Sequence, residues 1–374
     1  MAEPFKNWFG PDMVRAISTN LARASDRFDA ALFERLALKD LDRLELKQRS
    51  QQFSHAVEAA MPGTFEQCIG AMIAALHPQK DAAISDMRSD DTGLANFALM
   101  PLSAFVARNG LNKPAFSLRA LREMTMRGSS EFDVRPFFRD HAEITLKAAR
   151  GWAKDANLHV RRLASEGSRP RLPWGIRLHD FVRDPGPILP ILTALRDDPQ
   201  EYVRRSVANN LNDIAKDHPD LVAGIAVNWL RGASRDRARL VKHACRSLIK
   251  TGHAGALAAF GFGAPDLTSC SVVIGSERIK LGDNLEISLA IAAGHGPQKL
   301  AIDYVLHFLR ANGRQSAKVF KWCELTLAGG ESRTLSKTHP YRKVTTRRDY
   351  AGIQRLTVQI NGVDMGGADF ELEL

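Results

Sequence analysis

The segment NLHVRRLASEGSRPRLPW, residues 157–174, joins a carboxylate, several guanidiniums and an indole in one short stretch. Arg162, Glu166 and Arg169 follow one another at i, i+4 and i+7, so a helix here would place all three on one face. The glycine and prolines after Glu166 predict that the helix ends, and Trp174 follows in a Pro-Trp turn. Two interpretations are open: a salt-bridged helix end with Trp174 in the core, or a reactive site.

Two further carboxylates have similar surroundings. Glu131 lies in SSEFDVRPFF, four residues before Arg135, and is expected to start a helix. Asp213 lies in RRSVANNLNDI, eight residues after Arg205. Acids on a basic surface weaken phosphate binding, so they require a reason. Either they hold neighbouring arginines in place, or they stabilise a developing oxocarbenium ion and orient a water, as in cleavage of a sugar from its leaving group.

The elements expected to position these residues are helices. Through residue 127 the apolar residues follow a period of 3.6, with no alternating strand pattern. Val160–Arg162 then recurs as Val203–Arg205 and, less closely, as Leu240–Lys242, at intervals of 43 and 37 residues. Helix pairs at this spacing predict a HEAT-like solenoid, with the basic residues of the recurring helix on its concave face. Among them we expect Arg162, Arg204, Arg205 and Lys242 to contact DNA.

The sequence pattern changes near Gly252. The glycines between Gly252 and Pro265 predict a linker. Beyond it the hydrophobic residues alternate with a period of two, and Asn-Gly pairs at 312–313 and 361–362 are typical of hairpin turns. About seven strands in this stretch predict an immunoglobulin-like β-sandwich. We therefore expect a multidomain α plus β protein, with a HEAT-like α-helical solenoid over residues 1–262 and the β-sandwich over 266–374.

The composition favours a polyanionic partner. The chain of 374 residues has a net charge of +10 at pH 7 and a pI near 9.6. Such a basic excess is typical of proteins that bind nucleic acid or an acidic membrane surface. Residues 266–374 hold 14 Lys and Arg against 12 Asp and Glu, so most of the excess belongs to the helical part. No apolar stretch is long enough to cross a bilayer, so we expect no membrane partner.

A second basic feature lies near the C-terminus. Residues 333–348 contain six basic residues and no acid. We expect a loop that is either solvated or in contact with phosphate. The six are Arg333, Lys337, Arg342, Lys343, Arg347 and Arg348.

The cysteines indicate a reducing compartment. Cys68, Cys245, Cys270 and Cys323 share no metal-ligand spacing, and the histidines form no HxxxH pair. We therefore expect four free thiols and no metal site. The stretch MAEPFKNWFG lacks the charged and apolar regions of a signal peptide, so we expect a cytoplasmic protein.

Three motifs together resemble the AlkC branch of the HEAT-like repeat alkylpurine DNA glycosylases: SSEFDVRPF, VRRLASEGSRPRLPW and VRRSVANNLNDIAKDHP. The resemblance covers nearly the whole chain, including an immunoglobulin-like C-terminal domain. It implies excision of N3-methylated bases, 3-methyladenine and 3-methylcytosine, from duplex DNA to start base excision repair. It also implies that the base is not flipped into a pocket, in contrast to ordinary glycosylases.

The resemblance further assigns roles to residues. It implies catalytic carboxylates at Glu131, Glu166 and Asp213, with an aromatic contact at Trp174. It implies DNA-gripping arginines at Arg162 and Arg169, and it implies no metal and no organic cofactor. We expect a monomer that acts on DNA at the bacterial nucleoid.

Two other functions remain open at this stage. One is a non-enzymatic HEAT-like nucleic-acid scaffold in which the acids form structural ion pairs. The other is a protein-binding adaptor, for which a basic concave face fits only an acidic partner. The three acids separate these hypotheses, because a scaffold has no use for Glu166 beyond its pairing with Arg162.

Overall fold

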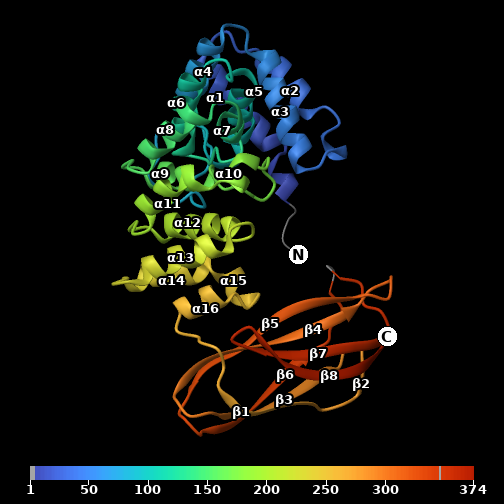
Figure 1. Ribbon diagram of the computed structural model, residues 1–374. Coiled ribbons are helices and arrows are strands. Elements are labelled where there is room, and N and C mark those ends of the chain that lie inside the picture. The colour runs from blue at the N-terminus through green and yellow to red at the C-terminus, as the bar shows by residue number, and fades with distance from the viewer. Residues whose placement is uncertain (1–4, 345–346) are drawn as a thin grey trace. The chain divides into compact units, whose positions relative to one another are not determined.

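The computed structural model describes residues 5–344 and 347–374 (Figure 1). The chain divides into two compact units after Asp217. The first unit is helical and the second combines helices with two β-sheets. Among the described residues, no helix is long and apolar enough to span a membrane.

The first unit contains twelve described α-helices joined by loops and 3-10 turns. They are α1 (Pro11–Ala24), α2 (Ala30–Leu38), α3 (Leu46–Ala60), α4 (Phe65–Ala74), α5 (Met100–Asn109), α6 (Pro114–Thr125), α7 (Arg135–Asp140), α8 (Ala142–Trp152), α9 (Leu158–Glu166), α10 (His179–Arg183), α11 (Leu189–Leu195) and α12 (Glu201–Ile214). The 3-10 turns are η1 (Phe5–Trp8), η2 (Leu41–Arg43), η3 (Asn96–Leu99) and η4 (Gly186–Ile188).

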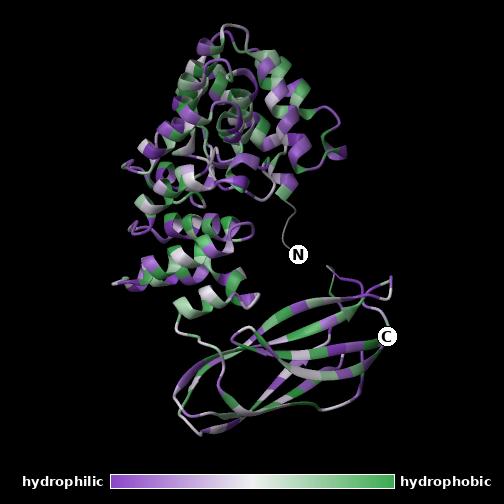
Figure 2. Cartoon of the chain, viewed as in Figure 1, coloured by the Kyte–Doolittle hydropathy of each residue, from purple (hydrophilic) through white to green (hydrophobic). Residues whose placement is uncertain are grey.

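Local sequence explains where these helices begin and which face they bury. The Asn157 side chain caps α9 by accepting from the backbone N–H groups of His159 and Val160, as a good N-cap residue does. The helix then buries Val160 and Leu163 completely. Hydrophobic and hydrophilic residues are interspersed along the helices in the way that one buried face requires (Figure 2).

The recurring Val-Arg-Arg motif lies on helices, as predicted. Its three copies fall on α9, α12 and α14 (Arg235–Ala244). Helix α9 packs against α12, and also against α6, α8 and α11. Because α9 and α12 are neighbours, side chains from the first two copies of the motif can meet.

The stretch predicted to be a linker contains a helix. In the second unit α13 (Pro219–Leu230), α14 and α15 (Arg246–Lys250) are followed by α16 (Ala254–Ala259), which packs against α13. The His253 side chain accepts from the Ala256 N–H and caps α16. The linker prediction for Gly252–Pro265 is therefore wrong over these residues, because an Ala-rich run with a cap forms a helix despite the glycines around it.

The helices of the second unit are joined to the β-sheets at glycines. Any Cβ on Gly252 would lie 2.6 Å from the Gly362 Cα, so the two backbones approach too closely for a side chain. The Asn361 side chain also donates to the Gly263 carbonyl at 2.7 Å. These contacts explain why α13–α16 group with the sheets rather than with the first unit.

The sheets form the predicted immunoglobulin-like sandwich, with eight strands instead of about seven. They are β1 (Leu267–Ile274), β2 (Arg278–Lys280), β3 (Asn284–Ala293), β4 (Gln298–Leu309), β5 (Gln315–Leu327), β6 (Ser332–Pro340), β7 (Gly352–Ile360) and β8 (Val363–Glu373). One sheet has the order β1-β3-β6 and the other β2-β8-β7-β4-β5. Neighbours pair antiparallel except β2 and β8, which are parallel.

The hairpin turns and the free thiols agree with the sequence. Asn361 and Gly362 both have positive φ, 49° and 79°, and connect β7 directly to β8. Gly313 has a φ of 74° in the turn between β4 and β5. All four cysteines are free.

Candidate active site

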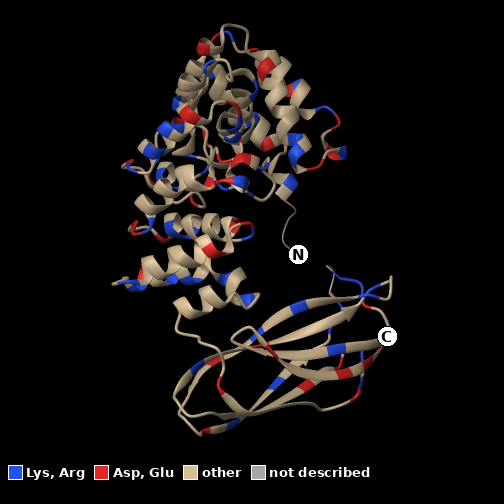
Figure 3. Cartoon of the chain, in the orientation of Figure 1, with Lys and Arg blue, Asp and Glu red and all other residues tan. Residues whose placement is uncertain are grey.

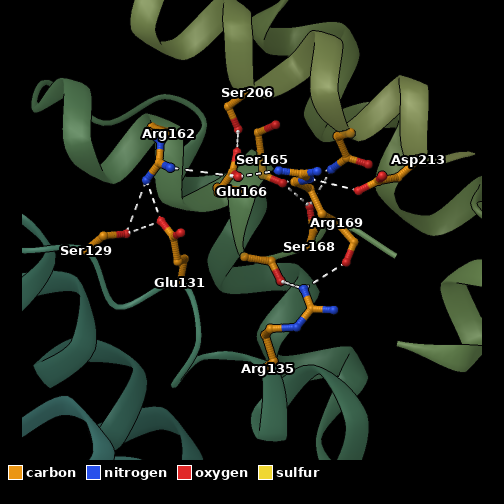
Figure 4. A network of polar contacts seen from close by, with 12 residues as sticks. Ser129, Glu131, Arg135, Arg162, Ser165, Glu166, Ser168, Arg169, Ser206 and Asp213 are labelled. Atoms are coloured by element: carbon orange, nitrogen blue, oxygen red, sulfur yellow. Dashed lines mark hydrogen bonds and ion pairs between the residues drawn. The ribbon is translucent and has the colours of Figure 1, made fainter. Parts of the chain in front are cut away.

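Glu166, Arg169 and Asp213 meet where α9 ends and α12 passes beside it (Figure 4). Arg169 donates from Nη1 to Glu166 Oε1 at 2.6 Å and from Nε to Asp213 Oδ2 at 2.8 Å. All three side chains are more than nine-tenths buried, with exposed fractions of 9%, 6% and 4% for Arg169, Glu166 and Asp213. One guanidinium therefore ties the carboxylate at the end of α9 to the carboxylate on α12.

Arg162 connects this pair to the third acid. Its Nη1 donates to Glu131 Oε2 at 2.6 Å and to Ser129 Oγ at 3.2 Å. Its Nη2 lies 3.8 Å from Glu166 Oε1, which is an ion pair without a hydrogen bond. Glu131, Arg162, Glu166, Arg169 and Asp213 thus form one continuous group, which we call the acid–arginine cluster (Figure 4).

Glu131 does not start a helix, contrary to the sequence prediction. It lies in a turn over residues 131–134, and α7 begins only at Arg135. Pro136 follows at the start of α7, where a proline is tolerated. Glu131 pairs with Arg162 rather than with Arg135, whose guanidinium donates to carbonyl groups of residues 167, 169 and 176.

Further donors hold each of the three acids, and for Glu166 and Asp213 they bind the second carboxylate oxygen. Ser206 Oγ donates to Glu166 Oε2 at 2.5 Å, and Lys216 Nζ lies 3.0 Å from Asp213 Oδ1. Ser129 Oγ lies 2.6 Å from Glu131 Oε2. The carboxylates are therefore held in fixed orientations rather than free to rotate.

The electrostatics of the cluster keep its arginines charged. Burial alone would lower the pKa of Arg162, but the neighbouring carboxylates, Glu131 foremost, raise that pKa above its ordinary value. For Arg169 burial again acts to lower the pKa, and Glu166 and Asp213 outweigh it, so this pKa is raised too. The cluster holds three carboxylates and two guanidiniums, and Lys216, about half exposed, is the further cation bonded to it.

Trp174 is exposed, so the alternative that places it in the core is wrong. Trp174 is 69% exposed, and its backbone has a φ of 66°, a value that a bulky residue rarely adopts. The Trp174 carbonyl accepts from Lys47 Nζ at 2.7 Å. The indole therefore stands on the surface, in the loop that also carries Arg169.

Four residues predicted to contact DNA lie on or beside the recurring helices, in different surroundings. Arg162 and Arg169 are engaged inside the cluster. Arg204 donates to the Asp198 carbonyl at 2.6 Å, and Arg205 is 65% exposed and pairs with Glu201. A DNA contact by any of these residues remains a prediction.

Lys242 lies in the second unit, on α14. Its side chain is half exposed and pairs with Glu324 on β5 at 2.9 Å. Basic and acidic residues are interspersed over the helices as well as over the sandwich (Figure 3). An exposed, solvent-screened pair of this kind contributes little to stability, so Lys242 can exchange its partner for a phosphate at small cost.

The predicted basic loop is partly a strand. Arg333 and Lys337 lie on β6, which ends at Pro340, so the loop itself begins later than the sequence indicated. Arg342 and Lys343 are exposed, and the Arg348 guanidinium lies 5.5 Å from the Tyr350 ring centroid. Thr345 and Thr346, within the predicted loop, lie outside the described residues.

Arg347 has a structural environment that the sequence did not predict. Its guanidinium lies 3.7 Å from the Phe308 ring centroid and pairs with Asp349 at 2.6 Å. The two side chains are 13% and 4% exposed. A phosphate contact by Arg347 would require this buried pair to open, so the expectation that it faces DNA does not fit the structure.

Sequence reasoning missed several residues that hold the cluster. Tyr202 covers Arg162, with the guanidinium 4.9 Å from the ring centroid. The sequence does contain a signal for Tyr202, because Tyr202 and His159 occupy the same position before the repeated Val-Arg-Arg motif. In the structure the centroids of their two rings are 5.7 Å apart. Ser129, Ser206 and Lys216 carry no such signal. Among the described residues, no group of three or more His, Cys, Asp or Glu side chains is placed to hold a metal ion.

The class of this protein is defined by two features: helical repeats that carry a buried cluster of acids and arginines, and an immunoglobulin-like domain. Comparisons with known proteins identify the family within this class. Residues 268–374 match the family model described as "Uncharacterised protein YhaZ, C-terminal Ig-like domain". The chain is 36% identical over 338 residues to YhaZ of Bacillus subtilis (strain 168), which covers 90% of each protein. It also resembles the solved structure of Pseudomonas fluorescens alkylpurine DNA glycosylase AlkC bound to DNA containing an abasic site analog. That match has a TM-score of 0.87, 33% identity and full coverage of both chains.

The chain therefore belongs to the AlkC-type family of HEAT-like repeat alkylpurine DNA glycosylases.

Proposed function

We propose that this protein is a DNA glycosylase that removes cationic N3-methylated bases, 3-methyladenine and 3-methylcytosine, from duplex DNA and so starts base excision repair. Membership of the AlkC-type family supports this proposal, as does the DNA-bound state of the AlkC structure that it resembles. The observation that carries it is the acid–arginine cluster, in which carboxylates from three chain segments meet within one group of ion pairs.

The cluster suits a substrate that is already activated. A base alkylated at N3 carries a positive charge, so its glycosidic bond breaks without a general acid to protonate the leaving group. What remains to be supplied is negative charge beside the sugar and a positioned water. Glu166 and Asp213 are held in fixed orientations for this role, and Trp174 offers an exposed aromatic face to a cation.

The proposed reaction balances without a cofactor. The bond between the sugar C1′ and the base nitrogen breaks, and its electron pair neutralises the cationic base. The sugar becomes an oxocarbenium ion, which the carboxylates of the cluster stabilise. A water oxygen then bonds to C1′, its proton leaves to a carboxylate or to solvent, and an abasic site remains.

DNA binding in this proposal depends on phosphate contacts. The net charge of +10 favours a polyanion, and Arg205, Arg342 and Lys343 are exposed. We propose that the base stays in the duplex and that the protein acts as a monomer at the bacterial nucleoid. The helical region 1–262 would carry the catalytic residues, and the sandwich over 266–374 would supply a second set of phosphate contacts.

The test is direct release of base. Single-stranded DNA is treated with a methylating agent, annealed to its complement and incubated with excess protein, and the supernatant is analysed for free methylated bases. We expect free 3-methyladenine and 3-methylcytosine, with no loss of activity on addition of a chelator. DNA that is bound but releases no base would favour the non-enzymatic scaffold, for which the paired acids are purely structural.

A further inference from the structure

The loop over residues 167–176 carries two residues of the candidate site, Arg169 and Trp174. It contains no helix or strand, and its backbone hydrogen bonds are single turn contacts such as Gly175 N–H to the Leu172 carbonyl. Its geometry is nevertheless demanding, because Trp174 combines a positive φ with a largely exposed side chain. Something outside the loop must hold it in this conformation.

Besides the ion pairs of Arg169 and Arg171, that support comes from Arg135, at the start of α7. Its guanidinium donates to the Gly167 carbonyl at 3.0 Å and to the Arg169 carbonyl at 2.7 Å. Its Nε and Nη2 both donate to the Ile176 carbonyl, at 2.7 and 2.5 Å. One side chain thus binds both ends of the loop. Figure 4 shows its contact at the end that carries Arg169.

Arg135 is a buried cation that is not directly paired with an acid. It is 0% exposed, and it forms no ion pair with any carboxylate in the described part of the chain. Burial, and then the nearby Arg169, lower its pKa to about 10. A buried charge of this kind is costly unless oriented dipoles compensate it, and here carbonyl groups of the loop provide that compensation.

Packing against the loop is equally close. A Cβ added to Gly175 would lie 3.1 Å from Arg135 Cδ and Nε and 3.2 Å from Leu172 Cδ2. The Arg135 side chain therefore fills the space beneath the residue that follows Trp174. On the outer side, Lys47 Nζ binds the Trp174 carbonyl.

We propose that Arg135 is a positioning residue for this site: its guanidinium fixes the 167–176 loop and thereby holds Trp174 in its exposed, left-handed conformation and Arg169 between the two acids. The predicted effect of Arg135 on excision rests on the proposed function. The predicted effect of Arg135 on the loop does not depend on that function. A lysine at this position keeps the charge but cannot donate along the loop to three carbonyl groups at once.

The test is Arg135→Lys, examined first by fluorescence. The chain has five tryptophans, so the emission of Trp174 is obtained by subtracting the spectrum of the same variant carrying Trp174→Phe. In Arg135→Lys we expect the Trp174 difference spectrum to shift to shorter wavelength, because the released loop lets the ring fall back onto the protein. An unchanged difference spectrum in a folded variant would overturn the proposal.

Excision provides the second measurement. Single-turnover release of base at saturating protein should fall by about 10²-fold, the effect expected when a reacting group is misplaced by about 1 Å. The dissociation constant for DNA should remain nearly unchanged, because Arg135 is buried and cannot touch phosphate. If the wild-type protein releases no base, the proposed function fails while the fluorescence result still decides the role of Arg135.

Arg49 provides a matched control. It is a second buried arginine of the first unit, 6% exposed, that donates to the carbonyls of Leu44, Lys6 and Phe9. Arg49→Lys should lower stability to a similar extent without moving the Trp174 spectrum or the excision rate. Equal effects of the two substitutions on spectrum and rate would show a general loss of folding and would overturn the proposal.

Gly175→Ala keeps the proposal testable if Arg135→Lys does not fold. The added methyl group presses on Arg135 without removing any donor. We expect the same direction of spectral shift and a smaller loss of single-turnover rate. Wild-type spectrum and rate in this variant, with Arg135→Lys unfolded, would assign Arg135 to stability alone.

Discussion

Replacing Glu166 with Gln separates charge from packing in the acid–arginine cluster. The two side chains have nearly the same shape. In the wild type, Arg169 Nη1 lies 2.6 Å from Glu166 Oε1 and Ser206 Oγ lies 2.5 Å from Glu166 Oε2. The Gln oxygen can still accept from Arg169 Nη1, and the Gln amide group can donate to Ser206 Oγ. The substitution therefore removes a negative charge while leaving the hydrogen-bond count intact.

The magnitudes of the two expected effects differ. A hydrogen bond to a charged group becomes a neutral one, so we expect a loss of about 1–2 kcal/mol in the free energy of unfolding. If Glu166 stabilises the oxocarbenium ion, excision should fall by about 10²–10³-fold, equivalent to roughly 3–4 kcal/mol of transition-state stabilisation. DNA affinity should be nearly unchanged, since the Glu166 side chain is 6% exposed.

The assay is single-turnover release of 3-methyladenine at protein excess, with binding measured by fluorescence anisotropy and stability by urea unfolding. Ser206→Ala is the matched control, because it removes the bond to Glu166 Oε2 and leaves the charge. We expect it to cost about 1 kcal/mol of stability and no more than roughly tenfold in rate. The reasoning is refuted if Glu166→Gln loses stability but keeps its rate per folded molecule, or if Ser206→Ala loses as much rate as Glu166→Gln.

Three further predictions concern DNA binding, pH and the C-terminal loop. DNA affinity should fall with salt with a log–log slope of about −5 if roughly six phosphates are contacted, and a flat response in a salt titration would contradict the basic surface as the DNA site. Burial raises the pKa of Asp133 to about 7, against the hydrogen bond from Ser103, so the folded protein holds a proton that the unfolded chain releases near pH 4. Stability should therefore decline between about pH 4 and pH 7 by roughly 2–4 kcal/mol, and urea unfolding of Asp133→Asn should show this decline removed. Replacing Arg342 and Lys343 with Ala should weaken DNA binding without changing stability. Arg347→Ala should instead cost about 3–5 kcal/mol of stability, because it leaves Asp349 unpaired. Equal shifts in melting temperature for the two variants would argue against this division.

Periodicity and turn chemistry predicted most of the fold. The helical period, the repeat of Val-Arg-Arg and the Asn-Gly turns are local signals, and each corresponds to an element of the structure. The errors occurred where a local signal was weak or ambiguous. Strand β2 has three residues, too few to show alternation, and α16 lies among glycines that are typical of linkers.

The site was harder to predict because its contacts are long-range. The sequence shows Arg135 four residues after Glu131, yet the acceptors of Arg135 are carbonyl groups 32 to 41 residues further along the chain. The pairing of Arg347 with Asp349 is local instead, and it was missed because Asp349 lies just beyond the acid-free run. Glu131, Glu166 and Asp213 meet because α9 and α12 stack, and the repeat predicted that stacking. The oxygen that each guanidinium binds depends on the folded loop, which the sequence did not reveal.

Conversion of a methylated base to free base plus an abasic site tests the central claim most directly. Duplex DNA with a single 3-methyladenine is incubated with excess protein, and free base and abasic sites are counted in the same sample for the wild type and for Asp213→Asn. The account predicts one abasic site per free base for the wild type, and a rate reduced by about 10²–10³-fold for Asp213→Asn with unchanged DNA affinity. Full occupancy of the DNA with neither product formed, or equal rates for the two proteins, would contradict it.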